Sequence, residues 1–213
     1  MSISQNPLTG HMRKSMGNFT VLKSRGKNII RSKPFQPKDP KTERQLLQRL
    51  KFKLLTDVYL SFGSIPDKGF VENRKQLTTY NLFLSVNYRL VYDKNSKNPV
   101  IDYRKLLVSK GSMPRLKVLE CILTNEGILV SFETGLELPK ASVTDELTAF
   151  AKLKNGELLI ATQPRGVVET GTIVLEYRDL NVEEIVCCYF FARSIDGKCS
   201  SNSMYIELRL LSD

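Results

Sequence analysis

The spacing of the hydrophobic residues changes near residue 98 of this chain. Before that point, one apolar stripe recurs at every fourth residue and consists of Leu46, Leu50, Leu54, Val58 and Phe62. This spacing predicts an amphipathic helix. Thr42 followed by Gln45 is typical of a helix-capping box, and Gly63 and Pro66 predict the end of the helix. Such a stripe is more typical of a side that faces the protein core than of a partner groove.

A second, shorter helix is predicted within residues 77–91, where leucine, valine and tyrosine are dense. Asn81 and Asn87 fall inside this range. Asparagine is a weak helix former, so these two positions leave the limits of the helix open.

From residue 98 onward, apolar and polar residues alternate in short runs, as they do in β-strands. The runs are VIDYRKLLVS, LKVLECILT, ILVSFET, ELTAFAKL, ELLIATQ, GTIVLEY, EEIVCCYFFAR and SMYIELRL. Asn155-Gly156 predicts a type I′ hairpin turn. We therefore expect an α+β fold in which a basic, largely extended arm (1–38) and a helical region (39–95) precede an antiparallel β-sandwich (98–213).

The positive charge is concentrated at the start of the chain. The 213 residues carry 32 Lys and Arg against 22 Asp and Glu, a net charge of +10. Residues 1–55 hold 13 of the basic residues and only two acids, Asp39 and Glu43, for a net of +11, so the remaining 158 residues balance to −1. Such asymmetry favours an anionic partner for the basic part.

The candidate residues for binding this partner lie in the arm and the first predicted helix. They are Lys23, Arg25, Lys27, Arg31, Lys33, Arg44, Arg49, Lys51 and Lys53. A cluster of this kind neutralises phosphates in nucleic-acid-binding proteins, but it also occurs on solvated surfaces and on arms that dock on acidic protein. Only Phe19, Phe35 and Phe52 are interleaved with it, which is few for base stacking.

Residues for catalysis or metal binding are scarce. His11 is the only histidine, so a Ser/His/Asp or Cys/His triad would depend on the N-terminal lead. The four cysteines lack metal-type spacing, and the adjacent Cys187 and Cys188 would point to opposite faces of a strand. The acidic pairs 145–146 and 183–184 are expected at exposed strand starts. We therefore expect no enzyme activity, no cofactor, no metal site and no small-molecule substrate.

Targeting signals are also missing from the sequence. The first 20 residues contain no apolar run of signal-peptide length, and no stretch approaches the length of a membrane span. Met16-Gly17 resembles a start, which would make residues 1–15 an extension. We expect a cytoplasmic or virion-associated protein that does not bind membranes.

Two spaced motifs resemble a known signature. Gly26, Arg31 and Pro34 fit G-x-x-x-x-R-x-x-P, and Pro40, Thr42, Gln45 and Arg49 fit P-x-T-x-x-Q-x-x-x-R. Residues 101–103, 107–111, 192–197 and 201–203 extend the likeness. Together they resemble a domain-of-unknown-function family common in Bacteroidota, over about residues 16–206. Asp39 stands where that family usually has Asn.

The resemblance implies no catalytic residues. Similar basic N-termini in phage and prophage proteins imply a role in a mobile element or a virion. The C-terminal half separately resembles fibronectin type III or immunoglobulin-like sandwiches in architecture, although it has no Trp.

The expected function is that of a non-catalytic structural or interaction protein whose sandwich contacts protein, or a second copy, while the arm engages an anionic partner. The alternative is a sequence-nonspecific nucleic-acid-binding protein that uses the arm and first helix. An adhesin-like surface module is a third class, but it conflicts with the missing signal peptide.

Overall fold

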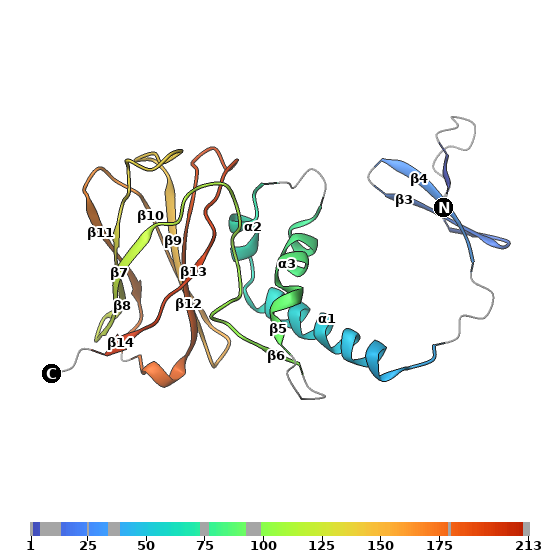
Figure 1. The fold of residues 1–213 in the computed structure, drawn as a ribbon, viewed down its shortest axis with the longest axis horizontal. Coiled ribbons are helices and arrows are strands. Elements are labelled where there is room, and N and C mark those ends of the chain that lie inside the picture. Colours follow the sequence, from blue (N-terminus) through green and yellow to red (C-terminus); the bar gives the residue numbers. More distant parts are fainter. Residues whose placement is uncertain are drawn as a thin grey trace. The chain divides into compact units, whose positions relative to one another are not determined.

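The computed structural model in Figure 1 describes residues 2–4, 14–24, 26–33, 39–72, 77–92, 99–178 and 180–210. The chain divides into two compact units, Met1–Thr42 and Glu43–Asp213. The predicted helical region and sandwich therefore lie in the same unit.

The first unit is a small antiparallel sheet with the strand order β1-β4-β3-β2. The strands are β1 (Ser2–Ser4), β2 (Lys14–Met16), β3 (Phe19–Ser24) and β4 (Lys27–Ser32). β3 and β4 form a hairpin that turns at Gly26, where φ is +78°, a conformation that glycine adopts without strain. Val21 is buried, whereas Phe19 is exposed.

Both predicted helices are present in the second unit. α1 covers Glu43–Ser61 and ends just before Gly63, where φ is +55°. α3 covers Thr79–Asn87 and continues into the short 3₁₀ helix η2 (Tyr88–Leu90). Contrary to the prediction, Pro66 does not end α1. It lies in the first turn of an additional helix, α2 (Ile65–Gly69), where the N–H that proline lacks would form no helical hydrogen bond.

The C-terminal half forms two sheets, mostly antiparallel, in a sandwich-like arrangement (Figure 1). One sheet has the order β10-β9-β12-β13 and consists of β9 (Glu146–Leu153), β10 (Leu158–Pro164), β12 (Ile185–Arg193) and β13 (Met204–Tyr205). The other has the order β11-β8-β7-β14 and consists of β7 (Lys117–Thr124), β8 (Gly127–Glu133), β11 (Thr170–Glu176) and β14 (Arg209–Leu210). The 3₁₀ helix η3 (Val182–Glu184) precedes β12. The α+β class is confirmed.

Two apolar clusters divide the interior of the second unit into layers. One lies between the two sheets and includes Cys188 and Phe190. The other lies between the helices and the β9–β12 sheet and includes Leu55, Cys187 and Tyr189. β12 is therefore buried on both faces, which explains its uninterrupted apolar sequence, and Cys187 and Cys188 lie on opposite faces as predicted. Full burial of a large apolar side chain contributes about 1.5–3 kcal/mol.

The run VIDYRKLLVS is not one strand, contrary to the prediction. Only β6 (Val100–Ile101) pairs, with β5 (Val91–Tyr92), and residues 102–109 form a loop. Leu106 and Val108 are buried in this loop. The backbone N–H and C=O of Leu107 bond to the side chain of Asn87 rather than to a neighbouring strand.

The run SMYIELRL is also divided. β13 pairs with β12 in one sheet, whereas β14 runs parallel to β7 in the other. Between them, Ile206 is buried in the cluster between the sheets, and its N–H donates to Cys188 O at 2.9 Å. The chain thus crosses from one sheet to the other at a buried residue.

The Asn155-Gly156 turn joins β9 to β10, but it is not of type I′. That type requires positive φ at both central residues, and only Gly156 has it, with φ of +91°. Asn155 Oδ1 accepts a hydrogen bond from the N–H of Glu157 at 2.9 Å, which stabilises a longer turn.

Candidate functional site

The predicted basic residues of the arm are placed on its hairpin. Lys23 lies on β3, and Lys27 and Arg31 lie on β4, followed by Lys33. Lys27, Arg31 and Lys33 are exposed. Because side chains alternate along a strand, Lys27 and Arg31 share one face of β4. Arg25, like Pro34 and His11, lies outside the described residues.

The predicted basic residues of the helix lie in the first half of α1, where Arg44, Arg49 and Lys53 are exposed and Lys51 is half-buried. Contrary to the prediction that the apolar stripe of α1 faces the core, only part of the stripe is buried. Leu46 and Leu50 are 43% and 45% exposed, whereas the helix is anchored in the core by its second half. Apolar and cationic side chains are thus mixed on the exposed part of α1.

A second concentration of positive charge was not predicted. A solvent-open groove of about 950 Å³ lies where α3, η2, the loop 104–107 and β13 meet. Its charged lining residues are Arg89, Arg104, Lys105, Lys110, Arg115 and Glu207. The five cations come from separate short segments, so they do not form a run of basic residues in the sequence. The only signal was the excess of nine basic over five acidic residues within 56–110, a range that holds four of the five cations.

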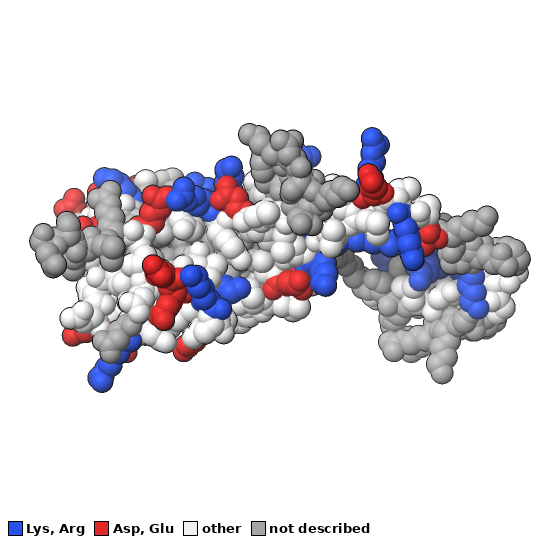
Figure 2. Space-filling view, turned by 90° about the horizontal axis from the view of Figure 1, so that it is seen from below, with Lys and Arg blue, Asp and Glu red and all other residues white. Residues whose placement is uncertain are grey.

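Carboxylates neutralise only part of the positive charge in this groove. Arg104 lies 3.5 Å from Glu207, and Lys105 lies 3.2 Å from Asp102. The exposed side chains of Arg89, Lys110 and Arg115 have no ion pair with any described residue. Figure 2 shows Lys and Arg side chains beside Asp and Glu side chains on the face it draws.

Tyr205 and Met204, which also line the groove, are half-buried. Burial raises the pKa of the Tyr205 phenol, and the nearby Arg104 guanidinium opposes this shift. Tyr205 packs edge-on against Tyr189 at 5.7 Å between ring centroids. The phenol is therefore neutral at pH 7 and adds no negative charge to the groove.

Buried serines fix the backbone beside the groove. Ser200 Oγ donates to Gly69 O at 2.8 Å, and Ser109 Oγ lies 2.9 Å from the same oxygen. Ser203 Oγ accepts from Val108 N–H at 3.0 Å. A side chain at Gly69 would collide with Val108 O, because a Cβ there would lie 2.3 Å away. These contacts join α2, the loop 108–112 and the loop 200–203, so the motifs 107–111 and 201–203 meet in space.

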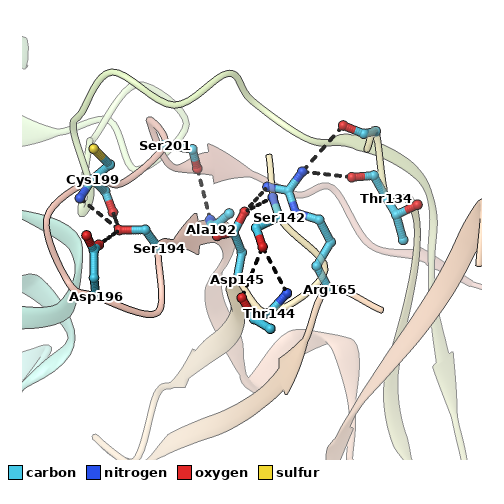
Figure 3. Close-up of polar contacts among 11 residues, drawn as sticks. Thr134, Ser142, Thr144, Asp145, Arg165, Ala192, Ser194, Asp196, Cys199 and Ser201 are labelled. Carbon is cyan, nitrogen blue, oxygen red and sulfur yellow. Dashed lines mark hydrogen bonds and ion pairs between the residues drawn. The ribbon is translucent and has the colours of Figure 1, made fainter. Parts of the chain in front are cut away.

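The two acidic pairs occupy different environments, and only one of them is exposed as expected. Glu183 and Glu184 are exposed in η3. Asp145, however, is buried, and its carboxylate lies 3.3 Å from the equally buried guanidinium of Arg165, which compensates its charge. Figure 3 shows Arg165 reaching toward both Asp145 and Thr134. The pair is enclosed by loops and has the character of a structural contact.

The cysteines are free thiols, of which Cys121, Cys187 and Cys188 are buried and Cys199 is half-buried. Burial raises the pKa of Cys187 to about 12, which keeps it protonated at neutral pH. Within the described ranges, no group of three His, Cys, Asp or Glu side chains is arranged to hold a metal ion.

The helices in the described part of the chain are all too short or too polar to cross a membrane. Neither a curated protein nor a solved structure matches the chain. One family model does match, and it covers residues 11–207, which include the described parts of the hairpin, all of α1 and every lining residue of the groove. The chain therefore belongs to this family, a family of unknown function designated DUF6266.

Proposed function

We propose that this protein is a non-catalytic interaction protein that engages an anionic macromolecule through its N-terminal hairpin and the first half of α1. The observation that carries the proposal is the exposure of Lys27, Arg31 and Lys33 in a stretch whose first acidic residue is Asp39. With no acid nearby in the sequence, these cations attract an anionic partner over the range of the Debye length, about 8–10 Å at physiological salt.

α1 has exposed apolar side chains beside cations of its own. Leu46 and Leu50 are exposed beside Arg44 and Lys53. Mixed apolar and cationic surfaces suit a protein partner with acidic and apolar groups, so an acidic protein surface is the first candidate. Nucleic acid is the second candidate, favoured by Lys27 and Arg31 on one face of β4, from which both reach phosphates of one backbone.

We also propose four properties that the sequence resemblances imply. They are the Bacteroidota distribution of the signature, the origin from a phage, prophage or other mobile element, a cytoplasmic or virion-associated location, and the likeness of the sandwich to fibronectin type III or immunoglobulin domains.

The test compares polyglutamate with double-stranded DNA as probes for the full chain. The variant Lys27→Glu/Arg31→Glu removes two exposed cations of the hairpin, and Lys154→Glu/Arg178→Glu is the matched control on the second unit. The hairpin variant should bind the preferred probe more weakly than the control does. If the probe is DNA, the slope of log affinity against log salt should fall by about 1.8, since each phosphate contact contributes about 0.9.

Two results would contradict the proposal. One is equal binding by the hairpin variant and the unmodified chain. The other is a failure of both probes to bind at low salt.

A further inference from the structure

We propose that the groove between α3 and β13 binds a nucleotide unit, with the phosphate at the cationic rim and the base against its apolar lining. This site lies in the second unit, is made of residues other than those of the hairpin, and does not depend on the function proposed above.

Charge is the first reason. The groove has five cations and one carboxylate among its described lining residues. The carboxylate of the groove, Glu207, forms an ion pair with Arg104 in which the two side chains are 69% and 71% exposed. An exposed pair of this kind is weak, about 0–1 kcal/mol, so an incoming anion displaces the carboxylate at little cost. Arg89, Lys110 and Arg115 have no described carboxylate to displace.

The types of cation form the second reason. Arg89, Arg104 and Arg115 provide planar guanidinium groups, whose parallel N–H donors match two oxygens of a phosphate. Lys105 and Lys110 add point charges. A ligand with several anionic oxygens therefore finds several donors in one groove.

The apolar lining distinguishes a nucleotide from a simple polyanion. Val86 and Leu90 on the helical side face the same groove as Met204 and Tyr205 on the strand side. Methionine and tyrosine offer surface to a flat heterocycle, and base contact with an aromatic ring contributes about 1–3 kcal/mol in other proteins. The groove volume of about 950 Å³ is at the upper end of the range typical of small-molecule sites.

Rigid surroundings are the fourth reason. Lys110 lies between Ser109, which is buried, and Gly111, where an added Cβ would lie 2.2 Å from Ser200 O. Ser203, at the start of the strand side, holds Val108 N–H. The backbone that carries the groove residues is thus held in place before any ligand binds, which lowers the entropic cost of binding.

The shared chemistry is a phosphate joined to a nucleobase, whether in a free nucleotide or in a single strand. Calorimetry on the full chain should therefore use ATP, inorganic triphosphate and a short oligothymidylate as separate probes. Binding of ATP but not of the oligonucleotide assigns a free nucleotide, and binding of both assigns a strand. Affinity for triphosphate equal to that for ATP would overturn the role of the base.

The decisive variants change exposed residues. Arg89→Ser/Arg115→Ser should weaken ATP binding roughly tenfold or more, the effect of losing one charged hydrogen bond or more. Glu207→Gln should strengthen it, because the groove loses its one described carboxylate and Arg104 is released. The hairpin variant Lys27→Glu/Arg31→Glu is the control and should bind ATP normally.

These variants separate the two proposals. Loss of ATP binding in the groove variant alone supports the nucleotide site whatever the hairpin binds. The absence of ATP and oligonucleotide binding at millimolar concentration would overturn it. So would an unchanged affinity in the groove variant, or equal competition by polyglutamate.

Discussion

Asn87 shows how one side chain fixes a loop that the strand pattern could not predict. It is fully buried at the end of α3. Its Nδ2 group donates to Leu107 O at 2.8 Å and to Phe83 O at 3.0 Å, and its Oδ1 accepts from Leu107 N–H at 2.8 Å. The side chain therefore substitutes for the strand partner that Leu107 lacks.

Replacing Asn87 with Ala should lower the free energy of unfolding by about 2–4 kcal/mol, because two backbone groups of Leu107 lose their partner. Urea denaturation measures the effect. Asn81→Ala is the matched control, since Asn81 is exposed on the same helix, and it should change stability by no more than about 0.5 kcal/mol. Equal effects of the two substitutions would show that the hydrogen bonds between Asn87 and Leu107 do not stabilise the fold.

The buried ion pair offers a second comparison at the residue scale. Arg165→Met should cost about 3–5 kcal/mol, because it leaves the buried carboxylate of Asp145 without its counter-charge. Lys117→Met, which breaks the exposed pair with Glu133 at 2.6 Å, should cost about 0–1 kcal/mol. Thermal or urea unfolding of both variants tests this, and similar losses would contradict the role of burial.

The buried thiol of Cys187 should lower the stability of the fold at alkaline pH. The pKa of its thiol in the folded chain is raised to about 12 by burial, and Lys152 opposes the shift. An unfolded thiol loses its proton near pH 8.5, roughly. The contribution of the buried thiol is complete below that pH and is lost as the pH rises toward about 12.

The free energy of unfolding should therefore fall between about pH 8.5 and pH 12, by up to about 1.4 kcal/mol per pH unit from this group. Urea denaturation at several pH values measures the slope. Cys187→Ala should have a shallower slope, whatever its stability at neutral pH, and an unchanged slope would assign the loss to other groups.

At the scale of elements, α1 joins two surfaces of different character. Leu55 is fully buried, whereas Leu50, five residues earlier, is 45% exposed. Leu55→Ala should lower stability by about 2–5 kcal/mol, since it leaves a cavity in the core. Leu50→Ala should change it by no more than about 0.5 kcal/mol. If urea denaturation gave both variants the same loss, the first half of the helix would also have to be anchored in the core.

Elements with a local pattern were predicted well. β9 coincides with the run ELTAFAKL, and β12 with the last nine residues of EEIVCCYFFAR, because each strand is a short run rich in apolar residues whose limits depend on neighbouring residues. The loop 102–109 and the divided last strand were missed. Their partners, Asn87 and Cys188, lie about 20 residues away in the sequence, so no local pattern encodes them.

At the scale of the whole molecule, one of the two candidate sites can be found from the sequence and the other cannot. The basic hairpin is visible in the sequence because its cations follow one another without acids. The groove is not visible, since Arg89 in η2, Arg104 in the loop 104–107 and Arg115 just before β7 come to line one groove only after the chain has folded. Charge counted along the chain therefore points to the hairpin as a candidate surface for an anionic partner, and it does not point to the groove.

Because the hairpin and the groove lie in different units, removing the first unit tests the two sites separately. The first 42 residues hold nine Lys and Arg and one Asp, so they contribute +8 of the net +10. Both apolar clusters of the second unit are built, among the described residues, from position 54 onward. A chain of residues 43–213 should therefore unfold cooperatively in urea, within about 1 kcal/mol of the full chain, because no cluster residue is removed.

The same shortened chain should elute from a cation exchanger at much lower salt than the full chain, because it retains a net charge of only +2. It should lose affinity for the probe that the hairpin binds but keep its affinity for ATP. A matched control is the shortened chain with Arg89→Ser/Arg115→Ser, which should lose both. Loss of ATP binding on shortening alone, with cooperative unfolding preserved, would mean that residues 1–42 form part of the nucleotide site and would contradict its assignment to the groove.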